Sequence, residues 1–180
     1  SPFTERLKEL GVPVFIGHDA KNIGDCDLII FSAAIKSDNV ERAEAKRRGI
    51  PELERSEALG QLTEGYESVV GIAGCHGKTT ITSMLALICE QGGPDATVHI
   101  GGFVDFLNGG VRLGAHDMFI TEACEYVESF LTLRPTIALI NNIDNDHLDY
   151  YGDMEHIVAA FKKFAALLPE NGLLIGNTDD

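Results

Sequence analysis

Basic residues are scarce in this sequence of 180 residues. Lys and Arg together number 14 against 28 Asp and Glu, which gives a formal net charge of −14 at pH 7. Proteins bind nucleic acid mainly by neutralising its phosphates with Lys and Arg, so this balance argues against a nucleic-acid partner. The aromatic residues are too scattered to form a platform on which bases could stack. We interpret the acidity as a contribution to solubility.

Long apolar runs, cysteine motifs and targeting signals are also missing. No uninterrupted apolar run approaches the ~20 residues that a membrane-spanning helix needs, so we expect no membrane insertion. No signal peptide is visible, nor is there an internal repeat or a low-complexity tract. The cysteines lie in or beside apolar segments without Cys-x-x-Cys spacing, which favours reduced thiols and a cytoplasmic location. They are Cys26, Cys75, Cys89 and Cys124.

The stretch 69–82 (VVGIAGCHGKTTIT) has the layout of a phosphate-binding P-loop. An apolar strand pattern is followed by a glycine turn, then by Lys78 and Thr79, and then by an apolar helical run. Glycines allow backbone N–H groups to converge on an anion at the positive end of the following helix. In such a loop Lys78 can reach the β- and γ-phosphates, and the hydroxyl of Thr79 can bind Mg²⁺.

One position departs from the general P-loop pattern. The pattern places a glycine five residues before Gly77, where this chain has Ile72, and the nearest glycine is Gly71. The core Gly-x-x-Gly-Lys-Thr is intact. A structural glycine turn is the alternative, but the flanking strand and helix patterns favour phosphate binding.

Strand and helix patterns alternate along most of the chain. Strands are expected at residues 12–16, 27–32, 69–73, 96–100, 118–121, 136–140 and 173–176. Helices are expected near residues 1–10, 39–48, 56–62 and 154–168, and in the run after Thr80 that contains the apolar residues of 84–88. The glycines at 101–102 and 108–110 (NGG) are expected to bracket a loop, with Gly101 and Gly102 as backbone turns. Such alternation implies an α/β fold with right-handed crossovers. We predict a Rossmann-like N-terminal part followed by a P-loop ATPase-type, mostly parallel sheet flanked by helices.

A polar stretch at residues 61–68 separates the two halves, which predicts domains at residues 1–64 and 65–180. The first half opens on a helix, without the strand and glycine loop that begin a Rossmann unit. The second half stops shortly after a strand. The sequence therefore predicts truncation at both ends, with the central domain cut short at its C-terminal end.

Two polar clusters follow predicted strands directly. Glu122 and Glu125 come at the end of the strand at 118–121, and Asn142, Asp146 and His147 follow the strand at 136–140. Ligands bind beyond the carboxyl ends of parallel strands, so both clusters are candidates for metal, phosphate or carboxylate contacts. Solvated acids and a helix-capping loop are the alternatives, which the P-loop in the same sheet makes less attractive.

Four stretches together resemble the Mur ligases, the ATP-dependent amide-forming enzymes of peptidoglycan precursor synthesis. The resemblance covers nearly the whole chain and rests on residues 31–39 (FSAAIKSDN), 74–80 (GCHGKTT), 122–131 (EACEYVESFL) and 142–149 (NIDNDHLD). His76 and the segment at 32–35 favour the branch that adds L-alanine to UDP-N-acetylmuramate. In residues 74–80, Cys75 stands where that branch has threonine.

The resemblance implies an activity and a set of site residues. ATP would phosphorylate the lactyl carboxylate of UDP-N-acetylmuramate, and the amine of L-alanine would attack the acyl phosphate, in the cytoplasmic steps of cell wall synthesis that support cell shape and division. The implied catalytic residues are Lys78, Glu122 and His147, and the implied metal ligands are Thr79 and Glu122 at one Mg²⁺ and His147 at a second. The implied nucleotide-binding residues are Gly74, Cys75, His76, Gly77, Lys78, Thr79, Thr80 and Asn142.

Glu125 and Asp146 are weaker candidates, expected to orient the metal ligands. The histidines at 18, 99, 116 and 156 are expected to be structural or surface groups, with a small claim of His18 on the UDP ligand. The family has three domains, of which this chain would hold the later part of the UDP-substrate domain and most of the ATPase, so we expect it to be inactive alone. A sister ligase that attaches a tripeptide to UDP-N-acetylmuramate, a plain P-loop NTPase and a non-catalytic nucleotide-binding module remain alternatives. Oligomeric state is not indicated.

Overall fold

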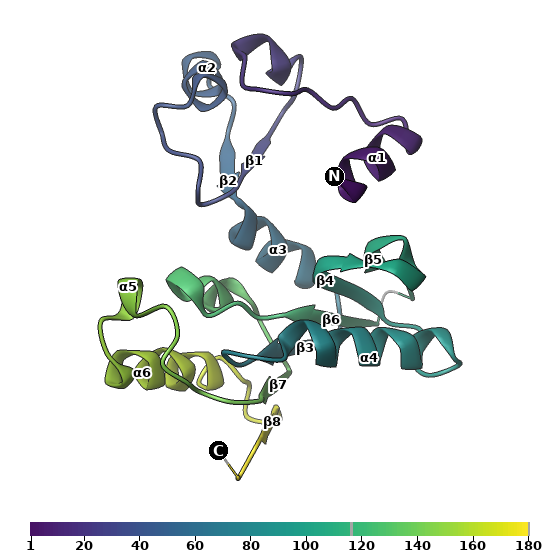
Figure 1. Ribbon diagram of the computed structural model, residues 1–180, viewed down its shortest axis with the longest axis vertical. Helices are drawn as coiled ribbons and strands as arrows, with labels where there is room; N and C mark the ends of the chain where they lie inside the picture. The colour runs from purple at the N-terminus through teal and green to yellow at the C-terminus, as the bar shows by residue number, and fades with distance from the viewer. Residues whose placement is uncertain (116, 180) are drawn as a thin grey trace. The chain divides into compact units, whose positions relative to one another are not determined.

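The computed structural model describes residues 1–115 and 117–179, and the chain divides into two compact units (Figure 1). The first unit is Ser1–Leu59 and the second is Gly60–Asp180. None of the helices in the described part of the chain combines the length and the apolar character that a membrane crossing requires.

The first unit is small and contains one two-stranded parallel sheet. Its elements are α1 (Pro2–Glu9), the 3₁₀ helix η1 (Ala20–Ile23), β1 (Ile29–Phe31), α2 (Val40–Arg48), β2 (Glu52–Glu54) and the start of α3 (Arg55–Thr63). β1 and β2 pair side by side in parallel. Asn39 caps α2 by accepting the backbone N–H of Glu41 at 2.9 Å, and Gly49 ends the helix in the left-handed conformation. The helix predicted at 39–48 is confirmed.

The strand predicted at residues 12–16 is wrong. This segment forms neither strand nor helix, and its apolar side chains are largely exposed, with Ile16 91% exposed. A strand requires a neighbouring strand for its backbone hydrogen bonds, and in this unit β1 and β2 pair only with each other among the described residues. The apolar composition of residues 12–16 therefore does not produce a strand, because no strand in the described part of the chain is there to pair with it.

The second unit is built on a six-stranded sheet in the order β5-β4-β6-β3-β7-β8. Its strands are β3 (Ser68–Ala73), β4 (Thr97–Val104), β5 (Gly109–Arg112), β6 (Met118–Glu122), β7 (Ile137–Ile140) and β8 (Leu173–Gly176). Neighbouring strands are parallel except for β5, which runs antiparallel to β4. The α/β class and the mostly parallel sheet are thus confirmed. β5 was not expected, and Gly101 and Gly102 lie inside β4 rather than in a loop.

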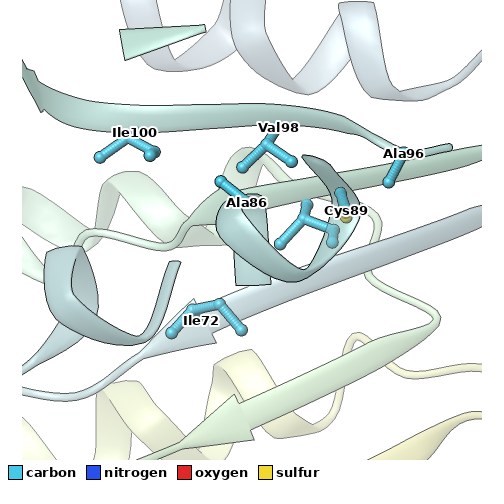
Figure 2. Packing of buried hydrophobic residues seen from close by; sticks show 7 residues of the cluster. Ile72, Ala86, Cys89, Ala96, Val98 and Ile100 are labelled. Carbon is cyan, nitrogen blue, oxygen red and sulfur yellow. The ribbon is translucent and has the colours of Figure 1, made fainter. Parts of the chain in front are cut away.

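Helices cover this sheet, and short 3₁₀ segments connect its strands. The helices are α4 (Lys78–Glu90), α5 (Leu148–Tyr151) and α6 (Met154–Ala165), and the 3₁₀ segments are η2 (Asp105–Leu107) and η3 (Tyr126–Thr132). One apolar core lies between α4 and the strands β3, β4 and β6 (Figure 2). Ile72, the residue in the place of the P-loop glycine, is fully buried in this core beside Ala86 and Val98. A glycine there would leave a cavity.

The opposite face of the sheet packs on aromatic rings. Successive residues of a strand point to opposite faces, so Gly71 faces away from the core that holds Ile72. A Cβ on Gly71 would lie 3.0 Å from the ring of Phe164, which comes from α6. The rings of Phe164 and Phe130 stack at 4.8 Å, and Phe161 meets Phe130 edge to face. This aromatic layer anchors α6 and the segment that follows β6.

The three central strands β6, β3 and β7 are parallel neighbours, so their carboxyl ends meet at one edge of the sheet. The loops at residues 74–77, 123–125 and 141–147 all begin at this edge. In open α/β sheets, this is where ligands bind.

Removing a ring from the aromatic layer should lower the urea concentration at which the second unit unfolds. We expect Phe164→Ala to lower the free energy of unfolding by about 3–5 kcal/mol, because the ring is fully buried and leaves a cavity over Gly71. Phe106→Ala, at a ring that is 47% exposed, should lower it by about 1 kcal/mol or less. Urea unfolding followed by circular dichroism measures both, and equal losses would contradict the packing described here.

Candidate functional site

A glycine turn links β3 to α4 at the carboxyl edge of the sheet. β3 ends at Ala73, and α4 begins at Lys78. Gly74 and Gly77 have φ angles of 137° and 84°, which side-chain-bearing residues rarely adopt. A Cβ on Gly74 would also lie 3.2 Å from the Cβ of Asn141. The N-cap residue of α4 is Gly77, and no side chain in the described part of the chain caps the first turn, so its backbone N–H groups can bind an anion.

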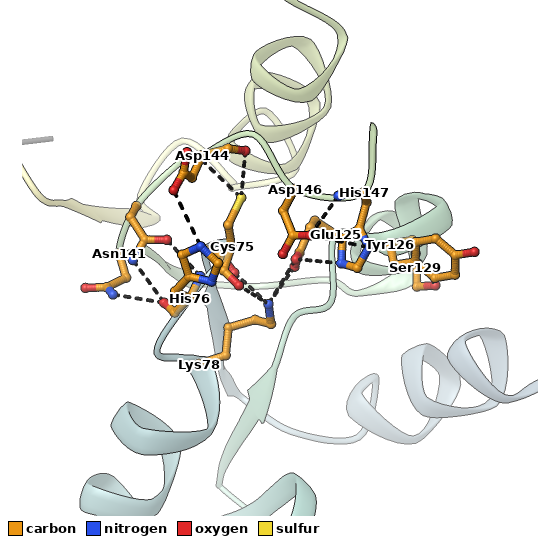
Figure 3. A network of polar contacts seen from close by, with 12 residues as sticks. Cys75, His76, Lys78, Glu125, Tyr126, Ser129, Asn141, Asp144, Asp146 and His147 are labelled. Carbon is orange, nitrogen blue, oxygen red and sulfur yellow. Dashed lines mark hydrogen bonds and ion pairs between the residues drawn. The ribbon is translucent and has the colours of Figure 1, made fainter. Parts of the chain in front are cut away.

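Two asparagines that follow β7 hold the glycine turn by hydrogen bonds: Asn141, which is labelled in Figure 3, and Asn142. The side chain of Asn142 accepts the backbone N–H of His76 at 2.8 Å and donates to the His76 carbonyl at 3.0 Å. Asn141 donates to the same carbonyl at 3.0 Å. The carbonyl of Asn142 also accepts the backbone N–H of Cys75 at 3.2 Å. Asn142 therefore fixes the shape of the turn through hydrogen bonds to the backbone of Cys75 and His76.

Cys75 forms a second link between the same two loops. Its thiol donates to the carbonyl of Asp144 at 3.3 Å, and its sulfur accepts the backbone N–H of Asp144 at 3.2 Å. Burial raises the pKa of the Cys75 thiol, against the opposing effect of the hydrogen bond with the Asp144 backbone. The protonated thiol is the form that can donate, so the raised pKa suits the bridging role.

The side chain of Lys78 lies at the centre of the site. Its Nζ contacts both carboxylate oxygens of Glu125, at 3.0 and 2.8 Å, and donates to the carbonyl of Gly74 at 2.6 Å. A fourth contact, with the Cys75 carbonyl, is longer at 3.3 Å. Glu125 is 1% exposed, so this is a buried ion pair whose charges have been removed from water.

Glu125 also belongs to a group that could bind a metal ion. It lies with Asp146 and His147, and one ligand atom from each lies within 4.8 Å of the others. His147 Nε2 is 3.5 Å from Glu125 Oε1, and the ring of Tyr126 packs against the imidazole at 4.8 Å. Two carboxylates and an imidazole are a donor set that fits a divalent cation such as Mg²⁺ or Mn²⁺.

Glu122 and Thr79 lie near neighbouring residues of β4. Glu122 accepts the backbone N–H of Gly101 at 3.0 Å, and the methyl carbon Cγ2 of Thr79 would lie 3.7 Å from a Cβ placed on Gly102. Thr79 is exposed at the start of α4, as is Thr80. A carboxylate and a hydroxyl are hard oxygen ligands of the kind that Mg²⁺ prefers.

A strained turn follows Glu125. Val127 and Glu128 have φ angles of 48° and 55°, a conformation that is unfavourable for non-glycine residues and most of all for a β-branched one. The segment is anchored on both sides: the Tyr151 hydroxyl donates to the Glu125 carbonyl, and Lys163 pairs with Glu128 at 2.7 Å. Burial raises the pKa of Tyr151, which keeps the phenol protonated as a donor. These anchors direct the Glu125 side chain towards Lys78.

Among the candidate metal ligands, the structure brings His147 together with Glu125 and Asp146, whereas Glu122 contacts Gly101 of β4 instead. Glu125, which the resemblance ranks below Glu122, is the acid that pairs with Lys78. The residue types alone do not predict this pairing, because Glu125 lies beyond the end of β6, next to the turn at 127–128.

A separate hollow of about 390 Å³ lies in the first unit, lined by residues that include Phe31, Ile35 and Arg42. Arg42 lies over the ring of Phe31 and pairs with Glu52 at 2.7 Å. His18 is also in the lining and contacts Glu41 at 2.8 Å.

The remaining histidines lie outside the site at the carboxyl edge of the sheet or outside the described residues. His99 contacts Thr121 on the neighbouring strand at 3.0 Å, and His156 contacts Asp153 at the start of α6 at 2.7 Å. His116 lies outside the described residues.

Comparison with known proteins gives matches over the whole chain. Residues 1–67 match the catalytic domain of the Mur ligase family, and residues 72–180 match the Mur ligase middle domain. The UDP-N-acetylmuramate–L-alanine ligases of Alkaliphilus metalliredigens and Acetivibrio thermocellus are 49% and 48% identical over all 180 residues. The chain spans 39% and 38% of the length of these two relatives.

Solved structures give the same result. A UDP-N-acetylmuramate:L-alanyl-gamma-D-glutamyl-meso-diaminopimelate ligase from Neisseria meningitides matches 99% of this chain and 61% of its own, with a TM-score of 0.86 and 28% identity. The UDP-N-acetylmuramate–alanine ligase of Thermotoga maritima matches 98% of this chain and 41% of its own, with a TM-score of 0.84 and 28% identity. With the middle-domain match covering more than half of its residues, this chain belongs to the Mur ligase family.

Proposed function

We propose that this chain is part of an ATP-dependent ligase that joins the lactyl carboxylate of UDP-N-acetylmuramate to L-alanine. The observation that carries the proposal is the 49% identity, over every residue of the chain, with an enzyme named for this reaction. The geometry supports it, because a glycine turn, an uncapped helix N-terminus and a group of possible metal ligands meet at one edge of the sheet.

A ligase that attaches a tripeptide to UDP-N-acetylmuramate is the second candidate. The Neisseria structure, whose name contains that peptide, matches this chain as well as the Thermotoga alanine ligase does, with TM-scores of 0.86 and 0.84. Backbone similarity therefore does not separate the two amines. The Thermotoga alanine ligase and the Neisseria protein are both 28% identical to this chain. We place alanine first because the relatives with 49% and 48% identity are named as alanine ligases.

We assign the two halves different roles. Residues 1–64 would be the later part of a Rossmann-like UDP-substrate domain, a role supported by the hollow beside Phe31 and Ile35. Residues 65–180 would be most of a P-loop ATP-binding domain, supported by the turn between β3 and α4. We place the reaction in the cytoplasm, among the steps of cell wall synthesis that serve cell shape and division. The four cysteines are all free thiols, in accord with a reducing compartment.

The site residues suit phosphoryl transfer to a carboxylate. A carboxylate is a poor electrophile, and phosphorylation supplies the leaving group that an amine can displace. The N-terminus of α4 would hold the phosphates, and Lys78 would neutralise their charge after exchanging its contacts with Glu125 and the turn carbonyls. Thr79 and Glu122 would hold one Mg²⁺, and His147 with Glu125 and Asp146 a second. Bound Mg²⁺ would supply further charge neutralisation at the transferred phosphate.

The reaction itself is the first test. With ATP, Mg²⁺ and UDP-N-acetylmuramate, the ligase that contains this chain should release phosphate when L-alanine is added and should form the alanine amide, detected by mass spectrometry. The tripeptide L-alanyl-γ-D-glutamyl-meso-diaminopimelate is the competing amine. Turnover with the tripeptide and none with alanine would select the second candidate, and phosphate release that ignores both amines would contradict a ligase.

Replacing Lys78 by an uncharged residue of similar length should separate its pairing with Glu125 from its proposed role in neutralising the phosphates. Lys78→Met leaves the Glu125 carboxylate buried and unpaired, so we expect a loss of about 3–5 kcal/mol in the free energy of unfolding. Adding Glu125→Gln removes that charge and should restore most of the stability. Turnover should stay at least about 100-fold below wild type in both variants, because the phosphates still lack their cation.

Lys162→Met is the matched control, since this lysine is exposed on α6. It should leave both stability and turnover near wild type. The assignment of Lys78 fails if Lys78→Met turns over within about threefold of wild type, a difference worth well under 1 kcal/mol. The ion-pair argument fails if the double variant is no more stable than the single one.

Glu122→Gln should raise the Mg²⁺ requirement. The substitution removes the negative charge of a proposed Mg²⁺ ligand, so the Mg²⁺ concentration for half-maximal turnover should rise about tenfold or more, while ATP affinity in EDTA changes little. Glu155→Gln, at an exposed acid of α6, serves as the control. An unchanged magnesium dependence in Glu122→Gln would make this residue an ordinary solvated acid.

A further inference from the structure

The glycine pair in β4 lies where the strand changes its hydrogen-bonding partner. β4 pairs with β6 up to the register His99↔Thr121, and its register with β5 shifts between His99 and Val104. Beyond that point the backbone N–H of Gly101 donates to the side chain of Glu122, at 3.0 Å from Oε1. A carboxylate therefore takes the place of a strand partner. Glycine inside a strand often marks such an irregularity or a close approach.

The backbone conformation does not require glycine at either position. Neither Gly101 nor Gly102 lies in the left-handed region, unlike Gly74 and Gly77 of the phosphate-binding turn. An L-residue could adopt both backbone conformations, so the absence of a side chain must be explained by the surroundings.

The surroundings differ sharply between the two glycines. A Cβ on Gly101 would lie 3.1 Å from Oε2 of Glu122 and 3.6 Å from its Cδ. A Cβ on Gly102 would lie 3.7 Å from Thr79 Cγ2, an ordinary van der Waals contact. The carboxylate of Glu122 thus lies against the bare backbone of Gly101, and a methyl group there would force it to move.

We propose that Gly101 is a positioning residue for Glu122. Its N–H group orients one carboxylate oxygen, and its missing side chain leaves room for the other, so that the carboxylate is held against the backbone of β4. This inference rests on the proposed role of Glu122 as a ligand of Mg²⁺. A carboxylate already oriented by a hydrogen bond loses less conformational freedom when it binds a cation.

The test compares two alanine substitutions one residue apart. Mn²⁺ binding in the presence of ADP is measured by electron paramagnetic resonance on the ligase that contains this chain, and ADP affinity is measured separately in EDTA. Gly101→Ala should weaken Mn²⁺ binding roughly tenfold, as Glu122→Gln does, and should leave ADP affinity in EDTA unchanged. Gly102→Ala should stay within about twofold of wild type for Mn²⁺, because its Cβ has room.

A double-mutant cycle covers the case in which Gly101→Ala lowers stability. The clash is with the Glu122 side chain, so in a Glu122→Ala background the same substitution should lower the melting temperature much less than in wild type. An equal loss in both backgrounds would place the clash elsewhere and overturn the proposal.

The outcomes also separate this inference from the proposed function. If Glu122→Gln weakens Mn²⁺ binding but Gly101→Ala does not, Gly101 is no positioning residue and the role of Glu122 stands. If wild type binds no Mn²⁺ with ADP, or if Glu122→Gln binds it as wild type does, the proposed metal site fails, and the inference about Gly101 fails with it.

Discussion

The buried ion pair between Lys78 and Glu125 is the interaction on which the candidate site depends. Removing a carboxylate and an ammonium group from water is expensive, and the attraction between them repays this only when further hydrogen bonds complete the shell of each. Here both carboxylate oxygens contact Nζ, and the Gly74 carbonyl contributes a third close acceptor. The pair joins the turn after β3 to the end of β6, so the shape of each loop constrains the other.

The same pair explains why the surrounding loops are so closely tied. Glu125 can reach Lys78 because the chain reverses through the strained residues Val127 and Glu128, and the aromatic layer around Phe130 holds that reversal in place. On the other side, Asn141 and Asn142 fix the turn that supplies the carbonyl acceptors. On the proposed function, an incoming phosphate would compete with Glu125 for Lys78. The released carboxylate would then face His147, already 3.5 Å away, where a cation could replace the lysine.

The sequence predicts which residues lie together at the candidate site, because the signals for it are local. The glycine turn, Lys78 and the polar residues after β6 and β7 follow from a strand pattern with its neighbouring residues, and a parallel sheet brings them to one edge. Prediction fails where the answer depends on distant partners. The apolar run at 12–16 forms no strand because it has no neighbouring strand among the residues described. Two consecutive glycines predict a turn, whereas in the structure Gly101 and Gly102 lie within β4, and the Glu122 carboxylate lies against Gly101. Which of Glu122 and Glu125 pairs with Lys78 could not be predicted, because the residue types do not indicate the strained turn at Val127 and Glu128 that follows Glu125.

The two acids near the end of β6 have different partners for a simple geometric reason. Glu122 is still within β6, where its carboxylate accepts the N–H of Gly101 in the neighbouring strand β4. Glu125 lies beyond the end of β6, and its carboxylate pairs with Lys78 at the start of α4. Lys78 and Thr79 are consecutive residues of that helix and so point about 100° apart around its axis. Lys78 therefore reaches Glu125, while the methyl group of Thr79 lies near Gly102 of β4.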